Sequence, residues 1–184
     1  MSLSPVSSTL VWLRRDLRCE DHAALHEALA SSQQVWVAFV FDTDILTPLP
    51  RRDRRVAFIH AALHEVDATL REWGHAGEGQ HPSKGDHGGT LQAGLMVRHG
   101  RPLDEIPALA AALGVQRVVA SHDDEPQALA RDAQVEQALA QRRIAWASVK
   151  DHVVFERREV MTLSGGAYGV FTPYKNAWLK RLAQ

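Results

Sequence analysis

The stretch LVWLRRD at residues 10–16 decides the fold. Its first half, Leu10–Leu13, is apolar at every position, which is typical of a strand covered on both faces of a parallel sheet. Its second half changes at once to charged residues, so polar groups follow the carboxyl end of that strand. We therefore expect a buried strand here, with functional groups directly after it.

Four further apolar runs repeat this pattern, at residues 35–41, 95–97, 115–120 and 144–147. Between them lie stretches with apolar residues at spacings of three and four, which predict amphipathic helices. Strands that alternate with such helices form right-handed crossovers and a parallel sheet with helices on both faces. The sequence therefore predicts a three-layer α/β fold with a five-stranded parallel sheet.

Local signals predict the helix ends. Asp21 and Asp53 are expected to cap the first helix and a long helix at residues 53–73. Gly114 suits the left-handed residue that ends a helix, and Pro126 suits the first turn of the next one.

Two segments fall outside this alternation. Residues 74–94 are rich in Gly and have almost no large apolar side chain, so we expect a mobile insertion there. After residue 150 the pattern changes to a connecting segment whose final stretch carries no helix stop signal. We therefore expect residues 1–150 to form one domain, and residues 151–184 to lead toward a further domain that is absent from this chain.

Composition excludes several classes of protein. The net charge of −1 over 184 residues gives no general attraction for nucleic acid. Cys19 is the single cysteine, which allows no internal disulfide and no Cys-based zinc site and suits a reducing cytoplasm. The first nine residues lack the parts of a signal peptide, and we expect no membrane contact. His60 and His64 lack the HExxH pattern, so no metal site is predicted.

The strand ends are where ligands bind in open parallel sheets. A dinucleotide-binding fold would carry GxGxxG after the first strand, but this chain has RRDLR at residues 14–18. It has no GxxxxGK[ST] motif, and Ser164-Gly165-Gly166 resembles a pyrophosphatase loop only faintly. A freestanding nucleotide-binding or electron-transfer module stays open as an alternative that no phosphate loop supports.

The opening stretch resembles a known family. Residues 10–18, followed by Asp21, are similar to the motif VWFRRDLRxxDN that opens the DNA photolyase/cryptochrome family. Further similar stretches extend over nearly the whole chain: Phe41-Asp42 with Ile45-Leu46, Asp53-Arg54-Arg55-Val56, Asp123-Asp124-Glu125-Pro126 with Ala130-Arg131-Asp132, and Phe171-Thr172-Pro173-Tyr174 with Asn176-Ala177-Trp178.

This resemblance implies an N-terminal, Rossmann-like domain with strand order 3-2-1-4-5 that can hold a light-harvesting antenna chromophore. The family's second domain is helical, binds FAD and uses light to split pyrimidine dimers flipped out of damaged DNA. The parent protein would then be a deoxyribodipyrimidine photolyase, a carbon–carbon lyase, with a cryptochrome-type blue-light photoreceptor as the alternative. Because the FAD-binding stretch is missing, no catalytic residue is expected in this chain, and the chain alone should be inactive.

The resemblance also implies an antenna pocket at the carboxyl ends of strands one, two and four. Its expected residues are Arg15, Asp16, Phe41, Asp42, Arg55, Asp123 and Glu125. Where folate-using members carry Asn and Glu on the helix after strand four, this chain has Gln127 and Ala128, which argues against methenyltetrahydrofolate. Asp123 matches an acidic position that deazaflavin-using members direct at their chromophore, so a deazaflavin or a flavin is expected.

Structural roles compete with these assignments. One of the arginines at positions 14, 15 and 18 is expected to pair with Asp16 and order the loop. Acids such as Asp42 and Asp123 often cap the turn or helix that follows them. His22 replaces the Asn of the family motif, and we expect this change to alter only a contact at the start of a helix.

Overall fold

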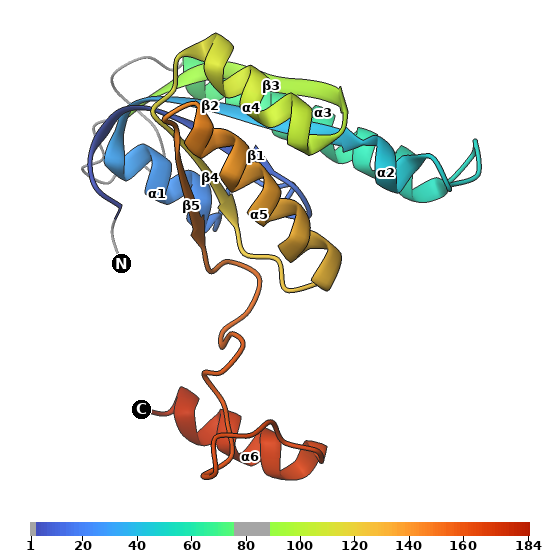
Figure 1. Cartoon of the computed structure of the whole chain (residues 1–184), viewed down its shortest axis with the longest axis vertical. Coiled ribbons are helices and arrows are strands. Elements are labelled where there is room, and N and C mark those ends of the chain that lie inside the picture. The colour runs from blue at the N-terminus through green and yellow to red at the C-terminus, as the bar shows by residue number, and fades with distance from the viewer. Residues whose placement is uncertain (1–2, 76–88) are drawn as a thin grey trace.

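The computed structural model describes residues 3–75 and 89–184, and these residues form one parallel sheet with helices around it (Figure 1). Within them the strand order is β3-β2-β1-β4-β5, and every neighbouring pair is parallel. The strands are β1 (Val6–Leu13), β2 (Ser32–Asp42), β3 (Thr90–Gly100), β4 (Arg117–Ser121) and β5 (Ala145–Val149). The helices are α1 (Ala23–Ser31), α2 (Thr43–Leu46), α3 (Arg54–His75), α4 (Pro102–Leu113), α5 (Pro126–Gln141) and α6 (Phe171–Leu182). The predicted α/β class and strand order are confirmed.

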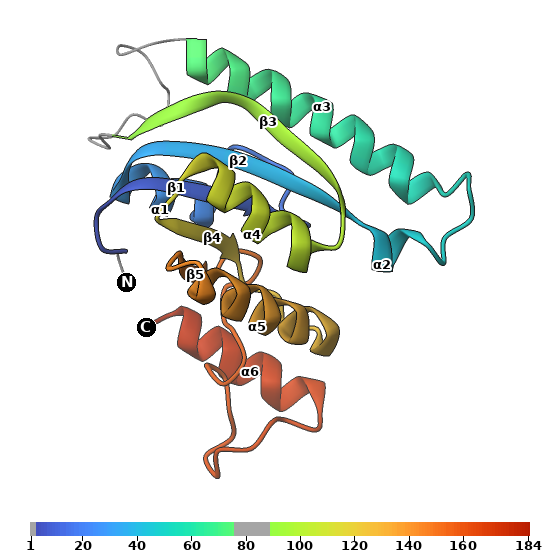
Figure 2. The same cartoon turned by 45° about the horizontal axis from the view of Figure 1, so that its top comes forward.

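Helices lie on both sides of the sheet, as Figure 2 shows, and a hydrophobic core is packed against each face. Successive side chains of a strand point to opposite faces. Leu10 and Trp12 accordingly join the core beneath α4 and α5, while Val11 and Leu13 join the core beneath α1 and α3. The unbroken apolar run of β1 therefore reflects burial on both sides.

The predicted insertion at residues 74–94 is wrong at both of its ends. Residues 74 and 75 belong to α3, and residues 90–94 belong to β3, which is much longer than the predicted strand at 95–97. Thr90 and Leu91 pair with Gln34 and Val35 of β2. Hydrogen bonding between main chains orders residues 90–94 although they include few large side chains. The pattern of apolar residues in the sequence does not reveal such pairing. The middle of the predicted insertion, residues 76–88, lies outside the described residues.

The helix ends agree with most of the local signals. Gly114 adopts the left-handed conformation with φ of 64°, and Pro126 begins α5. A carboxylate oxygen of Asp53 accepts a hydrogen bond from the backbone N–H of Arg55 at 2.8 Å, as a cap of α3 should. The prediction that Asp21 caps α1 was wrong, because the next residue, His22, is the cap.

His22 is that capping residue. Its Nδ1 atom accepts a hydrogen bond from the backbone N–H of Leu25 at 3.2 Å, while Asp21 has a φ of 49° and lies exposed before the helix. Because Nδ1 accepts a bond, the proton of a neutral His22 ring sits on Nε2. That atom lies 3.0 Å from Oδ2 of Asp16.

Asp16 is a buried carboxylate that joins three elements. Its Oδ1 accepts the backbone N–H of Arg14 at 2.7 Å, and its Oδ2 accepts the Ser121 hydroxyl of β4 at 2.5 Å. Burial by itself raises the pKa of the Asp16 carboxyl, but His22, Ser121 and the Arg14 amide outweigh it and hold this pKa well below its ordinary value. The end of β1, the start of α1 and the end of β4 are thus fixed by one ionised group.

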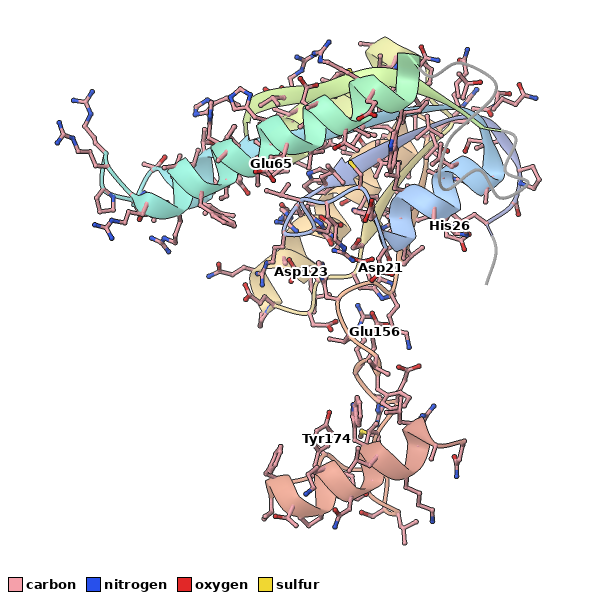
Figure 3. All side chains as sticks on the ribbon, turned by 180° about the vertical axis from the view of Figure 1, so that it is seen from behind. Asp21, His26, Glu65, Asp123, Glu156 and Tyr174 are labelled. Carbon is pink, nitrogen blue, oxygen red and sulfur yellow. The ribbon has the colours of Figure 1, made fainter. Side chains whose placement is uncertain are left out.

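Residues 151–184 extend from the sheet and end in α6, which lies away from it (Figure 1). Figure 3 shows Tyr174 in this outlying part and Glu156 on the way to it. A carboxylate oxygen of Glu156 accepts a hydrogen bond from Nδ1 of His122 at 2.7 Å, and Trp178 of α6 packs edge-on against Phe155. Among the described residues, no helix has the length and apolar character needed to cross a membrane.

The buried carboxylate yields a stability prediction. Replacing Asp16→Asn should lower the free energy of unfolding by about 1–3 kcal/mol at neutral pH, because a charged acceptor in a buried network is lost. Since the folded pKa is depressed, this stabilisation is fully present above the unfolded pKa of about 3.9 and is lost progressively as the pH falls from there toward the folded pKa. Urea unfolding at pH 7 and at about pH 3 should show the gap between wild type and variant closing on acidification. Asp21→Asn, an exposed neighbour, is the control, and an equal effect of both changes would contradict the role of Asp16.

Candidate functional site

A pocket of about 510 Å³ opens at the carboxyl ends of β1 and β2, beside the loop that follows β4. The start of α4, one face of α5, the short helix α2 and Ile59 of α3 complete its wall. The lining residues are Trp12, Leu13, Arg14, Arg15, Phe39, Val40, Phe41, Asp42, Asp44, Ile45, Leu46, Ile59, Arg101, Pro102, Leu103, Asp123, Glu125, Gln127, Ala128, Ala130, Arg131 and Gln134. Its size is within the range of small-molecule and cofactor sites.

Aromatic side chains line the pocket from two neighbouring strands. Trp12 of β1 is almost wholly buried, and Phe41 of β2 packs edge-on against Phe39 with 5.1 Å between ring centroids. The guanidinium carbons of Arg14 and Arg131 lie 4.9 and 5.0 Å from the centroid of the Trp12 ring. Rings and guanidinium planes of this kind favour a flat, aromatic guest.

A buried ion pair holds the floor of the pocket. The Arg14 side chain is 8% exposed and contacts both carboxylate oxygens of Asp132 on α5, at 2.7 and 2.6 Å. Arg14 also donates to the backbone carbonyl of Ser121 at the end of β4. Nη1 of Arg14 contacts both oxygens of Asp132 while Nη2 is bound to Ser121, so this one side chain joins α5 to the ends of β1 and β4.

The rim of the pocket carries charges that pair with one another. Arg15 lies 2.6 Å from an oxygen of Glu125 and 3.6 Å from an oxygen of Asp123. The hydrogen bond with Glu125 raises the pKa of Arg15 above its ordinary value. On the other side, Arg101 and Asp44 lie 3.4 Å apart. The rim is thus polar and has little excess charge.

The structure brings most of the predicted site residues together. Arg15, Phe41, Asp42, Asp123 and Glu125 all line the one pocket, as the shared edge of the sheet led us to expect. Their roles in binding stay predictions. Asp42 also accepts the backbone N–H of Asp44 at 2.9 Å, so the competing expectation of a turn-capping acid holds for it as well.

Two predicted site residues lie elsewhere. Asp16 is buried in the network with His22 and Ser121, and no described arginine side chain forms an ion pair with it, contrary to the expected loop-ordering pair. The Arg55 side chain is 71% exposed and pairs with Asp53 at 2.7 Å. This ion pair with the capping carboxylate of Asp53 holds the Arg55 side chain at the start of α3. Arg55 is not among the residues that line the pocket.

Arg131 and Gln134 of α5 were not among the predicted site residues, although a signal for them existed. They line the pocket together with Gln127, and the spacing of four and three places the three residues on one helix face. Gln127 and Ala128 do face the pocket, so the positions used above to argue against a folate are pocket positions. At Ala128 the wall offers a methyl group and no carboxylate.

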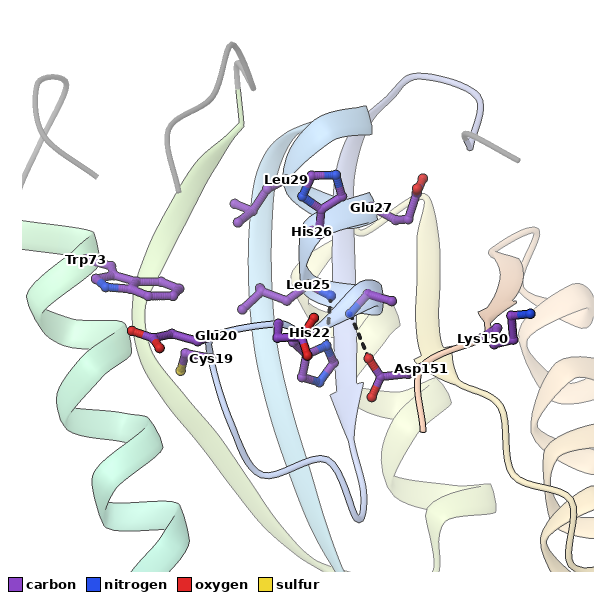
Figure 4. Close-up of a pocket in the computed structure, with 12 residues that line it drawn as sticks. Cys19, Glu20, His22, Leu25, His26, Glu27, Leu29, Trp73, Lys150 and Asp151 are labelled. Carbon is purple, nitrogen blue, oxygen red and sulfur yellow. Dashed lines mark hydrogen bonds between the residues drawn. The ribbon is translucent and has the colours of Figure 1, made fainter. Parts of the chain in front are cut away.

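A second pocket, of about 580 Å³, lies between α1 and α3 (Figure 4). It is lined by Trp73 and by acidic groups that include Glu20 and Glu27. Asp151 also lines it and accepts the backbone N–H of Ala23 at 2.9 Å. None of the predicted site residues lines this pocket, which is bordered by the loop after β1 and by Lys150 and Asp151 directly after β5.

One group of potential metal ligands occurs in the described part of the chain. Ligand atoms of Asp16, Asp151 and His152 lie within 4.8 Å of one another. Oδ2 of Asp16 already accepts the Ser121 hydroxyl, and Oδ2 of Asp151 accepts Arg18 at 2.8 Å. Hydrogen bonds from the chain itself therefore account for this clustering of carboxylates.

Comparison with known proteins identifies similar sequences and folds. The family model for DNA photolyase matches residues 9–76 and 89–184. A deoxyribodipyrimidine photo-lyase of Halobacterium salinarum is 32% identical over 181 residues, which cover 94% of this chain and 34% of that protein. The chain thus spans about a third of the length of the curated relatives it matches.

Solved structures with the same fold include photolyases and a cryptochrome. An archaeal photolyase from Sulfolobus tokodaii, described with two FAD molecules and the implication of a novel light-harvesting cofactor, has a TM-score of 0.62 at 23% identity, covering 82% of this chain and 32% of that one. A cryptochrome from Synechocystis has a TM-score of 0.74 at 18% identity, covering 100% of this chain and 35% of that one.

The ion pair beneath the pocket can be tested by mutation. Asp132→Asn should lower the free energy of unfolding by about 2–4 kcal/mol, because Arg14 would be left buried without its carboxylate. Glu136→Gln, exposed one turn further along α5, should change it by less than about 0.5 kcal/mol. Chemical unfolding measures both variants, and an unchanged midpoint for Asp132→Asn would show that this pair does not hold the pocket floor.

Proposed function

The chain belongs to the DNA photolyase family, and we propose that it is a light-harvesting antenna domain whose chromophore binds in the pocket at the strand ends. The observation that carries the proposal is the meeting of Trp12, Phe41, Arg15, Asp42 and Asp123 around one hollow. Aromatic walls with a polar rim suit a flat ring system that carries polar substituents.

A flavin or a deazaflavin is the proposed chromophore. The similar archaeal photolyase with two FAD molecules supports a flavin-type guest in this fold. The pocket wall at Gln127 and Ala128 supports the same choice, because it lacks the carboxylate that the family resemblance associates with folate. A bound chromophore would supply the absorption of light and the transfer of excitation energy to a second flavin.

The residues of this chain have a physical task in the proposed mechanism. Trp12 and Phe41 would hold the rings and exclude water, and Asp42 and Asp123 would accept hydrogen bonds from polar substituents. Arg15, held between Glu125 and Asp123, would close the rim. Because excitation transfer needs a fixed distance and orientation, no side chain here has to act as acid, base or nucleophile.

The proposed parent protein is a two-domain deoxyribodipyrimidine photolyase. Residues 1–150 would be its antenna domain, and residues 151–184 would connect to a helical FAD domain that contacts damaged DNA. The exposed apolar side chains of α6, such as Phe171, Leu179 and Leu182, support a docking partner for this segment. We propose that this chain alone does not repair DNA. A single cysteine supports a reducing, cytoplasmic setting.

A cryptochrome-type photoreceptor is the second candidate, because one of the similar structures is a cryptochrome. The two candidates share the antenna pocket and differ in what the full-length protein does with the excitation. Light-dependent loss of cyclobutane dimers from damaged DNA, measured with the full-length protein, would support the photolyase. Flavin photoreduction without such repair would support the photoreceptor.

Chromophore binding is the direct test of the antenna. Mass spectrometry of small molecules released from protein purified in the dark should identify a flavin or a deazaflavin that absorbs in the violet or blue. Riboflavin added to the pigment-free chain should bind, and Phe41→Ala should weaken binding by about tenfold, which is about 1.4 kcal/mol of lost ring contact.

Phe58→Ala is the matched control, since Phe58 is 73% exposed on α3 and does not line the pocket. Equal weakening by both variants would show that the ligand lies elsewhere. Absence of any released pigment, together with no binding of riboflavin or a deazaflavin, would contradict the antenna. Binding of ATP by calorimetry in their place would favour a nucleotide-binding module.

A further inference from the structure

Trp12 is an electron-rich ring in the wall of a pocket that is proposed to hold an excited chromophore. Its side chain is 2% exposed, and it packs at 6.2 Å from Trp146 in the adjoining core. An indole beside an excited flavin is a ready electron donor, because indole is the most easily oxidised side chain after the thiolate and phenolate groups. Without nearby charges that oppose electron transfer, Trp12 would therefore be expected to quench the excited chromophore.

The guanidinium groups of two arginines lie over the Trp12 ring. The guanidinium carbon of Arg14 is 4.9 Å and that of Arg131 is 5.0 Å from the ring centroid. Arg14 is held by Asp132, and Arg131 lies 3.0 Å from Asp132 and 3.9 Å from Asp123. Both cations are thus fixed by carboxylates and cannot swing away from the indole freely.

We propose that Arg14 and Arg131 keep Trp12 from donating an electron to an excited chromophore in this pocket, so that the excitation survives long enough to be passed on. This inference rests on the proposed antenna function and deepens it. It assigns the two arginines a role as positioning residues that act through Trp12.

The step that they suppress is a one-electron transfer. One electron leaves the indole, which becomes a radical cation, and enters the excited chromophore, which is reduced by one electron. The same electron then returns, both groups regain their ground states, and the absorbed energy is released as heat. No bond is broken and no external oxidant is needed.

Fixed positive charge opposes this step. A cation near the ring stabilises the neutral indole through its π electrons and repels the radical cation that would replace it. Burial strengthens both effects, because little water screens the charges. If one guanidinium is removed, Asp123 and Asp132 remain near the ring with a single arginine. The local charge then becomes more negative, which favours oxidation of the Trp12 indole.

The test compares charge with shape at position 131. Arg131→Met removes the cation, Arg131→Lys keeps it, and the double variant Trp12→Phe/Arg131→Met also removes the donor. Each protein is loaded with riboflavin, the bound fraction is measured by fluorescence anisotropy, and the emission lifetime of that fraction is recorded. Arg131→Met should shorten the lifetime severalfold, Arg131→Lys should preserve most of it, and the double variant should restore it.

Two results would overturn the proposal. One is a lifetime in Arg131→Met equal to that of the wild type, and the other is a shortened lifetime that persists when Trp12 is absent. A purely structural role for Arg131 would change affinity or unfolding and leave no lifetime effect that depends on Trp12.

A ligand-free measurement separates this proposal from the antenna itself. The pigment-free proteins are exposed to a soluble photosensitised one-electron oxidant, and oxidation of Trp12 is quantified by peptide mass spectrometry. Arg131→Met should show severalfold more oxidation at Trp12 than Arg131→Lys and the wild type. Equal oxidation in all three would overturn the protective role, whereas failure of riboflavin to bind the wild type would count against the proposed antenna function.

Discussion

The buried carboxylate of Asp16 is the constraint on which the strand-end architecture depends. It accepts the Arg14 amide of its own loop and the Ser121 hydroxyl of β4, and it faces the ring of His22 that caps α1. An ionised group in the interior is tolerated only when donors surround it. The loop after β1 is therefore locked in one conformation, and the neighbouring strand and helix are locked with it.

In that conformation of the loop, the consecutive side chains of Arg14 and Arg15 point in different directions. Arg14 turns into the protein and forms the buried ion pair with Asp132 of α5, while Arg15 lies at the rim and pairs with Glu125. One short stretch thus fixes both the floor and the edge of the pocket. The position of α5 follows from the first of these contacts, which explains how a helix far along the chain comes to face β1.

The sequence was sufficient for the fold where burial on both faces leaves a continuous apolar run, as in Leu10–Leu13. It failed where the main chain supplies the order, since residues 90–94 join β3 through pairing with β2. The shared sheet edge predicted that Arg15, Asp42 and Asp123 lie close together, and they line one pocket, while their roles in binding stay predictions. The direction in which a charged side chain points was not predictable. Asp16 lies against His22 and Arg55 pairs with Asp53, and both stay outside the pocket. Sequence spacing does not show which of several possible partners a charged side chain will contact.

The pattern of charges also bears on what kind of site this is. Arg15, Arg101 and Arg131 each lie within ion-pair distance of an acid of the same pocket. A catalytic acid or base needs a group poised to exchange a proton with the substrate, whereas these groups are paired with one another, and the buried pair of Arg14 and Asp132 holds α5 against the end of β1. Rigidity is what excitation transfer requires, because its rate depends on the distance and orientation of two chromophores. Arg131, one of these paired cations, lies beside Trp12 together with Arg14, so the interactions that hold the pocket in shape include those proposed to protect the excited state of its guest.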